Sequence, residues 1–232
     1  MSQDTGIRKE KMTRYVKRLL LFGPPGAGKG TQAAVIAERL GVKHVDTGSI
    51  IRENIKSGTP LGVEAKAYVE KGELVPDELI IRLIADRLKK DEVSEGWLLD
   101  GFPRSLEQAK ALSGMGRNGG EAVERVVFLE VPDEVLLRRL TNRRICAKCK
   151  AVYNLVTDMR PKKDGICDKC GSGLIQRADD NEESVRTRFR VYRESTAPIA
   201  EYYGKKGLIV RVSGEGPVEE GAERIMAALA AD

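Results

Sequence analysis

The feature that most constrains this chain is a glycine-rich turn between an apolar run and a helix-forming segment. The apolar run is Leu19–Phe22, the turn reads Gly-Pro-Pro-Gly-Ala-Gly-Lys over residues 23–29, and the helix-forming segment is Gln32–Leu40. The order strand, turn and helix, with Gly-x-x-x-x-Gly-Lys at the join, is the spacing of a phosphate-binding P-loop. The pattern therefore predicts a nucleotide-binding α/β domain.

The chemistry of this turn is local. Glycine lets the backbone curl so that several N–H groups point at one anion, and the first turn of the helix adds further N–H groups and the positive end of its dipole. Lys29 brings a mobile charge to the outer phosphates. A glycine-rich turn without a ligand is the alternative, and a lysine at this offset argues against it. Gly30 follows the lysine and the hydroxyl comes at Thr31, whereas a common P-loop ATPase has Ser or Thr directly after the lysine.

Length and composition limit the function classes. The 232 residues allow one core domain with insertions or two small domains, and 41% hydrophobic with 32% charged residues is ordinary for a globular protein. The net charge of +5 suits either nucleic acid or an enzyme with two polyphosphate substrates. No apolar run approaches the roughly 20 residues of a membrane span, and the N-terminus lacks a secretory apolar region. We therefore expect a cytoplasmic protein with no membrane partner.

A second apolar strand, residues 96–99, ends at Asp100 and is followed by Gly-Phe-Pro-Arg104. Ligands of parallel α/β sheets bind at the carboxyl ends of the strands, so Asp100 is expected beside the P-loop. An acid in this place orients Mg²⁺; a helix cap is the alternative, which Pro103 so close behind disfavours. The position of Arg104 just past the strand favours anion binding over a solvated charge.

Several other charged residues are candidates for the same site. Arg139 and Arg143 are four residues apart, which predicts one shared helix face and an anion that bridges them. Asp179 and Asp180 either pair with such arginines or cap the next helix. His44 is the only histidine and is expected to be structural, which disfavours a Ser-His mechanism.

Four cysteines form two C-x-x-C pairs: Cys146, Cys149, Cys167 and Cys170. This spacing predicts a four-thiolate Zn²⁺ site that is closed and structural, and metal binding would hold together a lobe with almost no core of its own. Two disulfides are the weaker alternative because the chain shows no secretion signal.

Five motifs together resemble the adenylate kinase family, in its bacterial long form with a zinc-bearing lid. They are the P-loop at residues 23–31, Thr-Gly-x-x-x-Arg at 47–52, Asp-Gly-Phe-Pro-Arg at 100–104, Asn-Arg-Arg at 142–144, and Arg-x-Asp-Asp-x-x-Glu at 177–183 with Arg188. They occur in the family's order from about residue 17 to the C-terminus. Asn142, where the family most often has Gly, and Ala178 after Arg177 are small departures.

The resemblance implies reversible, Mg²⁺-dependent transfer of the terminal phosphoryl group of ATP to AMP, giving two ADP. It implies a P-loop NTPase fold, with a five-stranded parallel sheet flanked by helices. The implied parts are an extension (1–16), a core (17–45, 76–141 and 181–232), a helical AMP flap (46–75) and the zinc lid (142–180). We expect a monomer that holds nucleotides and no nucleic acid.

The resemblance also implies the site residues, motif by motif. On the ATP side they are Gly26, Ala27, Gly28, Lys29, Gly30, Thr31, Arg139, Arg143, Val152, Tyr153 and Gly216. On the AMP side they are Thr47, Arg52, Glu73, Leu74, Val75, Gly101, Phe102, Pro103, Arg104, Gln108, Arg177 and Arg188. The catalytic set is Lys29, Arg52, Asp100, Arg104, Arg139, Arg143, Arg177 and Arg188.

Two rival functions remain open on the sequence. One is a kinase for another nucleoside monophosphate; Thr47 and Gln108 favour adenine, but base choice depends on the shape of the pocket. The other is a zinc-containing nucleic-acid-binding ATPase, which the positive charge permits. The 5% aromatic content and the lack of an aromatic-rich basic strand for stacking bases argue against it.

Overall fold

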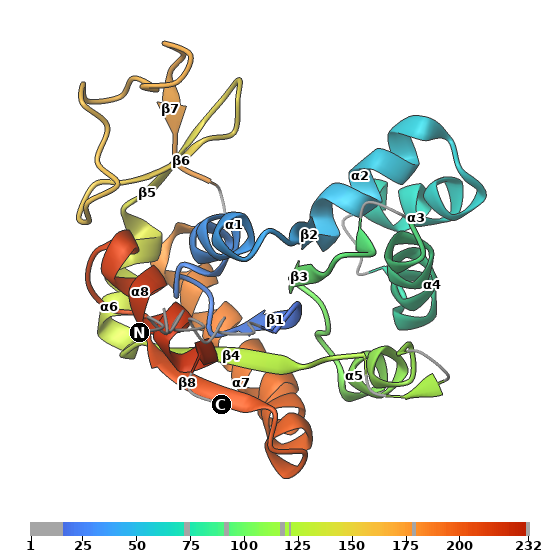
Figure 1. The fold of residues 1–232 in the computed structure, drawn as a ribbon. Coiled ribbons are helices and arrows are strands. Elements are labelled where there is room, and N and C mark those ends of the chain that lie inside the picture. Colours follow the sequence, from blue (N-terminus) through green and yellow to red (C-terminus); the bar gives the residue numbers. More distant parts are fainter. Residues whose placement is uncertain are drawn as a thin grey trace, which may run out of the picture.

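The computed structural model describes residues 16–71, 75–90, 93–116, 119–120, 122–177 and 180–230. At its centre is a five-stranded parallel sheet in the order β2-β3-β1-β4-β8 (Figure 1). The strands are β1 (Arg18–Phe22), β2 (Lys43–Asp46), β3 (Trp97–Asp100), β4 (Arg125–Glu130) and β8 (Ile209–Ser213). The predicted five-stranded P-loop fold is confirmed.

The central strand β1 explains why the sheet forms at this place in the sequence. Leu19, Leu20 and Leu21 are all buried, as expected for a parallel strand that helices cover on both faces. Leu21 lies opposite Asp100 of β3, and Asp46 of β2 lies opposite the same residue. This register places the P-loop, Asp46 and Asp100 together at the carboxyl ends of the strands.

Two apolar cores, one on each face, attach the helices to the sheet. One core takes residues from α2 (Thr47–Ser57), α3 (Pro60–Lys71), α4 (Asp77–Leu88), α5 (Leu106–Ser113) and the C-terminal half of α7 (Glu182–Lys205). The other takes residues from α1 (Lys29–Leu40), α6 (Asp133–Thr141), α8 (Val218–Ala230) and the N-terminal part of α7. Helix α7 therefore contributes to both cores.

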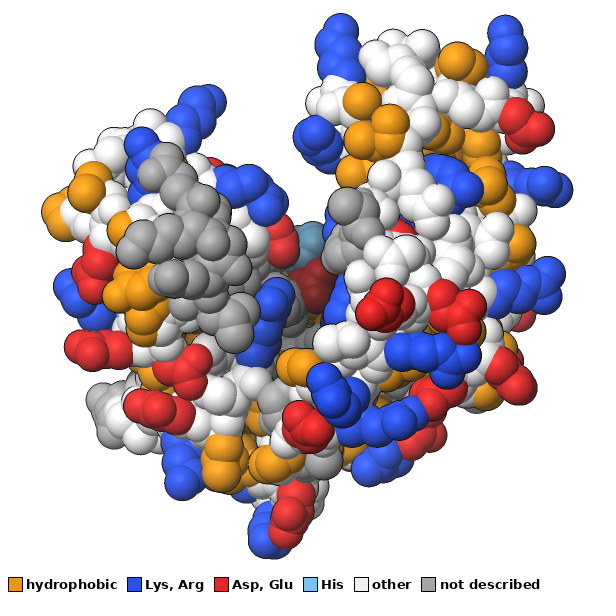
Figure 2. All heavy atoms as spheres, turned by 180° about the vertical axis from the view of Figure 1, so that it is seen from behind, with side chains coloured by type: hydrophobic (Ala, Val, Ile, Leu, Met, Phe, Trp, Pro, Cys, Tyr) orange, Lys and Arg blue, Asp and Glu red, His pale blue; other side chains and the backbone are white. Residues whose placement is uncertain are grey.

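Two insertions project from the sheet. Helices α2 and α3 pack against each other on one side, and a three-stranded antiparallel sheet of order β6-β5-β7 stands on the other (Figure 1). Its strands are β5 (Arg143–Cys146), β6 (Val152–Asn154) and β7 (Leu174–Ile175). Figure 2 shows a deep hollow between the two projecting parts.

Two expectations about helix ends are wrong. Helix α1 begins at Lys29, three residues before the predicted start, because Gly28 with φ 89° makes the turn immediately before it. Helix α6 ends at Thr141, so Arg143 opens β5 and does not share a helix face with Arg139. The side chains of Thr141 and Asn142 donate to the carbonyls of Leu137 and Arg138 and so close the helix.

Candidate active site

The P-loop conformation depends on its glycines. Gly26 and Gly28 have φ of 86° and 89°, in the left-handed region that L side chains rarely adopt. A Cβ on Gly26 would lie 2.9 Å from Cγ of Leu140, so the loop also packs too closely on α6 to accept a side chain. Glycine is therefore required at these positions for the loop to take this shape before the N-terminus of α1.

Lys29 lies across this loop. Its Nζ donates to the carbonyls of Gly23 (2.7 Å) and Pro24 (3.0 Å). Burial lowers the pKa of Lys29 to about 8; the negative charge of Asp100 opposes this shift, and the positive charges of Arg104 and Arg188 add to it. The lysine therefore stands in a field that favours an incoming anion.

Asp100 approaches the first turn of α1 closely. A Cβ on Gly30 would lie 3.3 Å from Oδ2 of Asp100, which accounts for glycine directly after the P-loop lysine. His44 Nε2 lies 3.8 Å from the same oxygen, is buried, and finds no hydrogen-bond partner among the described residues. The histidine therefore lies beside the acid, outside the lining of the cavities described next.

A cavity of about 840 Å³ opens over the P-loop, between the core and the small three-stranded sheet β6-β5-β7. It brings together seven residues of the predicted catalytic and ATP sets from far apart in the chain: Lys29, Asp100, Arg139, Arg143, Arg177, Arg188 and Gly216. Val152 and Tyr153 line it as well, although the Tyr153 side chain is mostly buried in its own lobe. We call this the first cavity.

Asp180 fixes two of these arginines. Its carboxylate is fully buried; Oδ2 accepts from Nε of Arg143 at 2.8 Å and Oδ1 from Nη1 of Arg188 at 3.3 Å. A buried carboxylate between two guanidinium groups holds them in fixed positions while leaving the pair with a net positive charge. Of the two alternatives for this acid, pairing is confirmed, since Asn181 caps α7. Asp179 lies outside the described residues.

Arg139, which also lines the first cavity, is held by a different contact. Its Nη1 donates to the carbonyl of Gly214 at 2.8 Å. Burial lowers the pKa of Arg139, and the negative charges of Glu215 and Asp158 oppose this shift. The guanidinium thus lies against the loop that follows β8.

A second cavity of about 380 Å³ adjoins the first, because Lys29 and Arg188 line both. The segment 101–104 forms one of its walls, with a cis peptide bond between Phe102 and Pro103. Arg104 Nε donates to the carbonyl of Gly101 at 2.8 Å. The predicted segment 101–104 therefore lies directly beside the P-loop lysine.

Other predicted AMP residues lie on the flap side and line neither cavity. Thr47 Oγ1 donates to the carbonyl of Asp100 at 3.2 Å. Arg52 is 71% exposed and pairs with Asp46 at 3.2 Å, and the buried Gln108 donates to Asp77 at 2.6 Å. Val75 packs on the core at the edge of the described flap, and Glu73 and Leu74 lie outside the described residues.

The four cysteines meet in the small sheet. Their sulfur atoms all lie within 4.8 Å of one another, with Cys146–Cys170 at 3.4 Å and Cys149–Cys167 at 3.5 Å. A tetrahedral site with Zn–S bonds of about 2.3 Å requires sulfurs about 3.8 Å apart, so the donor set fits zinc. All four are free thiols, and Ser172 lowers the pKa of Cys170 to about 6 by hydrogen bonding to it.

Two functional candidates have no motif of their own. Asp46 caps α2, accepting from Gly48 and Ser49, and also holds Arg52; an acid directly before Thr-Gly at a helix start was the available signal. Asp158 reaches from the small sheet to accept from the backbone N–H of Val218 at 2.9 Å. Nothing in the local sequence pointed to that second contact.

Comparisons with known proteins agree with this geometry. A sequence model of the family described as "Adenylate kinase" matches residues 21–208. The chain is 47% identical to an adenylate kinase of Kosmotoga olearia over 207 residues (89% of this chain, 96% of the relative). It is 48% identical to one from Streptomyces avermitilis over 212 residues (91% and 96%), and 47% identical to one from Archaeoglobus fulgidus over 201 residues (87% and 92%). Among the described residues, none of the helices combines the length and the hydropathy of a membrane span.

Proposed function

The chain belongs to the adenylate kinase family, and we propose that its two adjoining cavities are the places where the two nucleotides meet. Adenylate kinase transfers the terminal phosphoryl group of ATP to AMP, giving two ADP. The observation that carries the proposal is that Lys29 and Arg188 line both cavities. A phosphoryl group that passes from one cavity to the other stays within reach of the same two cations.

ATP is assigned to the first cavity. Its phosphates lie on the backbone of residues 26–31 with Lys29 at the outer phosphates, and its base lies between Arg139 and the backbone of Gly216. The support is the glycine cradle, the N-terminus of α1 and the lining of the cavity.

AMP is assigned to the flap side, with its phosphate at the mouth of the second cavity. Arg104 and Arg188 line that mouth, and Arg177 lies in the adjoining first cavity. The base then points toward Thr47 and Gln108. Arg52 reaches the phosphate only if it leaves Asp46, so the assignment of Arg52 requires the flap to move.

The transfer itself needs no covalent help from the protein. An oxygen of the AMP phosphate attacks the terminal phosphorus of ATP, the bond to the bridging oxygen breaks, and that oxygen leaves as part of ADP. The protein aligns the two groups and stabilises the charge of the transition state with guanidinium and ammonium groups. Arg143 and Arg188 are held for this role by Asp180.

Two metals complete the proposal. Asp100 carries a hard oxygen donor that makes no hydrogen bond with the described residues, which fits Mg²⁺ bound with ATP. When bound with ATP, Mg²⁺ would neutralise part of the phosphate charge. Zn²⁺ held by the four cysteines has a structural role in the lobe of residues 142–180.

The remaining parts of the proposal concern motion and setting. Residues 46–75 and 142–180 close over the cavities and exclude water, which competes with AMP as the acceptor. The enzyme acts as a monomer in the cytoplasm, where four thiols stay reduced and free to bind metal.

A substrate panel tests the function. The purified chain is given Mg-ATP with AMP, CMP, UMP or GMP, and nucleoside diphosphate formation is measured. We expect AMP to give the highest kcat/KM by a wide margin. A higher value with CMP, UMP or GMP would contradict the assignment of AMP as acceptor.

A further inference from the structure

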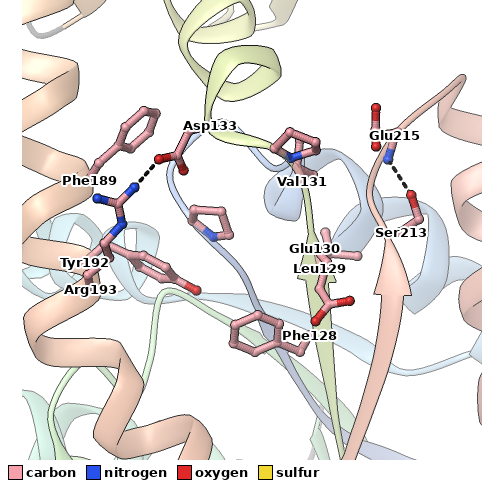
Figure 3. Close-up of a pocket in the computed structure, with 12 residues that line it drawn as sticks. Phe128, Leu129, Glu130, Val131, Asp133, Phe189, Tyr192, Arg193, Ser213 and Glu215 are labelled. Atoms are coloured by element: carbon pink, nitrogen blue, oxygen red, sulfur yellow. Dashed lines mark hydrogen bonds and ion pairs between the residues drawn. The ribbon is translucent and has the colours of Figure 1, made fainter.

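A third cavity lies behind the P-loop, between β4, α7 and the loop after β8 (Figure 3). Its volume of about 530 Å³ is within the range of small-molecule sites. We call it the rear pocket and define it by Pro24, Phe128, Val131, Phe189, Tyr192 and Glu215. None of its lining residues belongs to the ATP or AMP sets proposed above, and Tyr192 also lines the second cavity.

The rear pocket and the first cavity share a wall. In the segment 213–216, Ser213 and Glu215 line the rear pocket, whereas Gly214 and Gly216 line the first cavity. The segment packs tightly on the residue that follows β4, because a Cβ on Gly214 would lie 2.7 Å from Cγ2 of Val131. A molecule in the rear pocket therefore presses on the reverse side of the proposed ATP base site.

Tyr192 supplies an unused hydrogen-bond donor. Figure 3 shows its ring reaching from α7 toward Phe128 of β4. The hydroxyl is buried, and no described residue offers it a hydrogen bond. Burial raises the pKa of Tyr192 to about 12, against the opposing effect of Arg211, so the hydroxyl keeps its proton near neutral pH. A buried hydroxyl without a partner is unfavourable, and a ligand with an acceptor atom removes that cost.

The walls and the charges narrow the class of ligand. Phe128, Leu129 and Phe189 form apolar walls that suit a flat ring. Two of the carboxylates are already paired: Glu130 with Arg211 at 2.6 Å, and Asp133 with Arg193.

Glu215 is the third carboxylate of the rear pocket, and it is exposed. It forms no salt bridge with a described residue, although its charge acts on Arg139. The exposed carboxylate of Glu215 therefore makes the rear pocket favour a cationic ligand over an anionic one. A cation placed on Glu215 also weakens the attraction between Glu215 and Arg139.

We propose that the rear pocket binds a small aromatic ammonium compound and that its occupancy changes the affinity for ATP. The ring lies between Phe128 and Phe189, an acceptor atom lies at the Tyr192 hydroxyl, and the ammonium group lies at Glu215. The coupling to ATP acts through residues 213–216 and through Arg139.

Tyramine is the probe, because it carries an aromatic ring, a phenol oxygen and an ammonium group. Binding to the zinc-loaded full chain is measured by ligand-observed NMR and calorimetry. Phenethylamine, which lacks the phenol oxygen, and the Tyr192→Phe variant with tyramine are each expected to bind about fivefold more weakly. The anion 4-hydroxyphenylacetate is expected not to bind.

Matched controls separate the site from general effects. Tyr202→Phe, on the same helix but outside the pocket, and Glu223→Gln, on the exposed face of α8, should leave tyramine affinity unchanged. Glu215→Gln should weaken it. Absence of binding at millimolar tyramine, or equal affinity in wild type, Tyr192→Phe and Glu215→Gln, would overturn the proposed site.

The coupling is tested separately and rests on the proposed place of ATP. Linkage is reciprocal, so tyramine affinity measured with and without saturating Mg-ATP should differ by at least about twofold. Equal affinities would overturn the coupling and leave the binding result standing. The binding arm does not depend on where ATP lies, so the two failures can be told apart.

Discussion

At the scale of single residues, Asp180 determines the geometry of the arginine cluster. It is fully buried and pairs with Arg143 of β5 and with Arg188 of α7, two residues far apart in the sequence. Removing one member of a buried ionic cluster leaves the others uncompensated. The acid therefore contributes both to stability and to the position of two proposed catalytic groups.

The Asp180→Asn variant tests this role. We expect a loss of about 1.5–3 kcal/mol in the free energy of unfolding, because two partly exposed guanidinium groups lose their buried counter-charge, together with a lower kcat. Urea unfolding and steady-state kinetics measure the two effects. Glu182→Gln is the control: its pair with Arg186 is exposed and should contribute less than about 1 kcal/mol. Equal effects of the two substitutions would refute the account of Asp180.

The arginines that we propose to contact the transferring group should matter for rate more than for folding. Arg104→Ala, Arg143→Ala and Arg177→Ala are each expected to lower kcat/KM by roughly 10³-fold, the lower end of the effect of such a group in related phosphoryl transfers. Circular dichroism should show a folded protein. Arg186→Ala, on the exposed side of α7, is the matched control and should keep its activity. Wild-type turnover in one of the three variants would remove that residue from the catalytic set.

Lys29 predicts proton uptake on ATP binding. Burial lowers its pKa from the usual 10.5 to about 8, so above pH 8 the free enzyme carries a largely neutral lysine. Bound phosphates favour the charged form and raise this pKa again. At pH 9 ATP binding should therefore take up close to one proton, and at pH 7 close to none.

Calorimetry in two buffers of different ionisation enthalpy measures this uptake. Lys29→Arg keeps its charge at both pH values and should abolish the uptake while ATP still binds. Uptake that is the same at pH 7 and pH 9 would show that Lys29 is not the titrating group.

At the scale of elements, we expect the small sheet β5–β7 to depend on metal binding by the four cysteines. Its buried cluster contains only Cys146, Tyr153 and Cys167, and Tyr153 is tied in through the backbone N–H of Asp168 at 2.8 Å. So small an apolar core contributes little stability, and metal binding energy is folding energy in lobes of this kind.

Zinc removal should therefore act locally first. After chelation we expect fast hydrogen exchange across residues 143–175, a melting temperature lower by several degrees, and a lower kcat because the lid no longer closes as a rigid body. Added zinc should restore all three. An unchanged melting curve, with metal analysis proving the zinc gone, would contradict a structural role.

The elements also show which features could be predicted from the sequence. The P-loop and the cysteine pairs were predictable because their chemistry depends on spacings of a few residues. The end of α6 before Arg143 was not, because side-chain bonds from Thr141 and Asn142 close a helix whose residue pattern could have continued. The pairing of Asp180 with Arg143 spans 37 residues and depends on how α7 packs.

At the scale of the whole molecule, the described parts form a core from which two parts project (Figure 1), with a hollow between them (Figure 2). This arrangement of a core, a flap and a lid was predicted from the sequence only because the order of the motifs resembles that of the adenylate kinase family. The shared lining of the two cavities by Lys29 and Arg188 came only from the structure. So did the rear pocket, since residues from elements and loops far apart in the chain build it. Because Asp46 pairs with Arg52, the proposed role of Arg52 at the AMP phosphate requires the flap to move.

The most direct test of this account is a crystal structure with a bisubstrate mimic that joins ATP to AMP through a phosphate chain. We predict that Lys29, Arg104, Arg143, Arg177 and Arg188 lie within hydrogen-bond distance of that chain, and that Arg52 has left Asp46 for the AMP phosphate. A complex in which these guanidinium groups point into solvent, with the mimic bound elsewhere, would contradict the central claim.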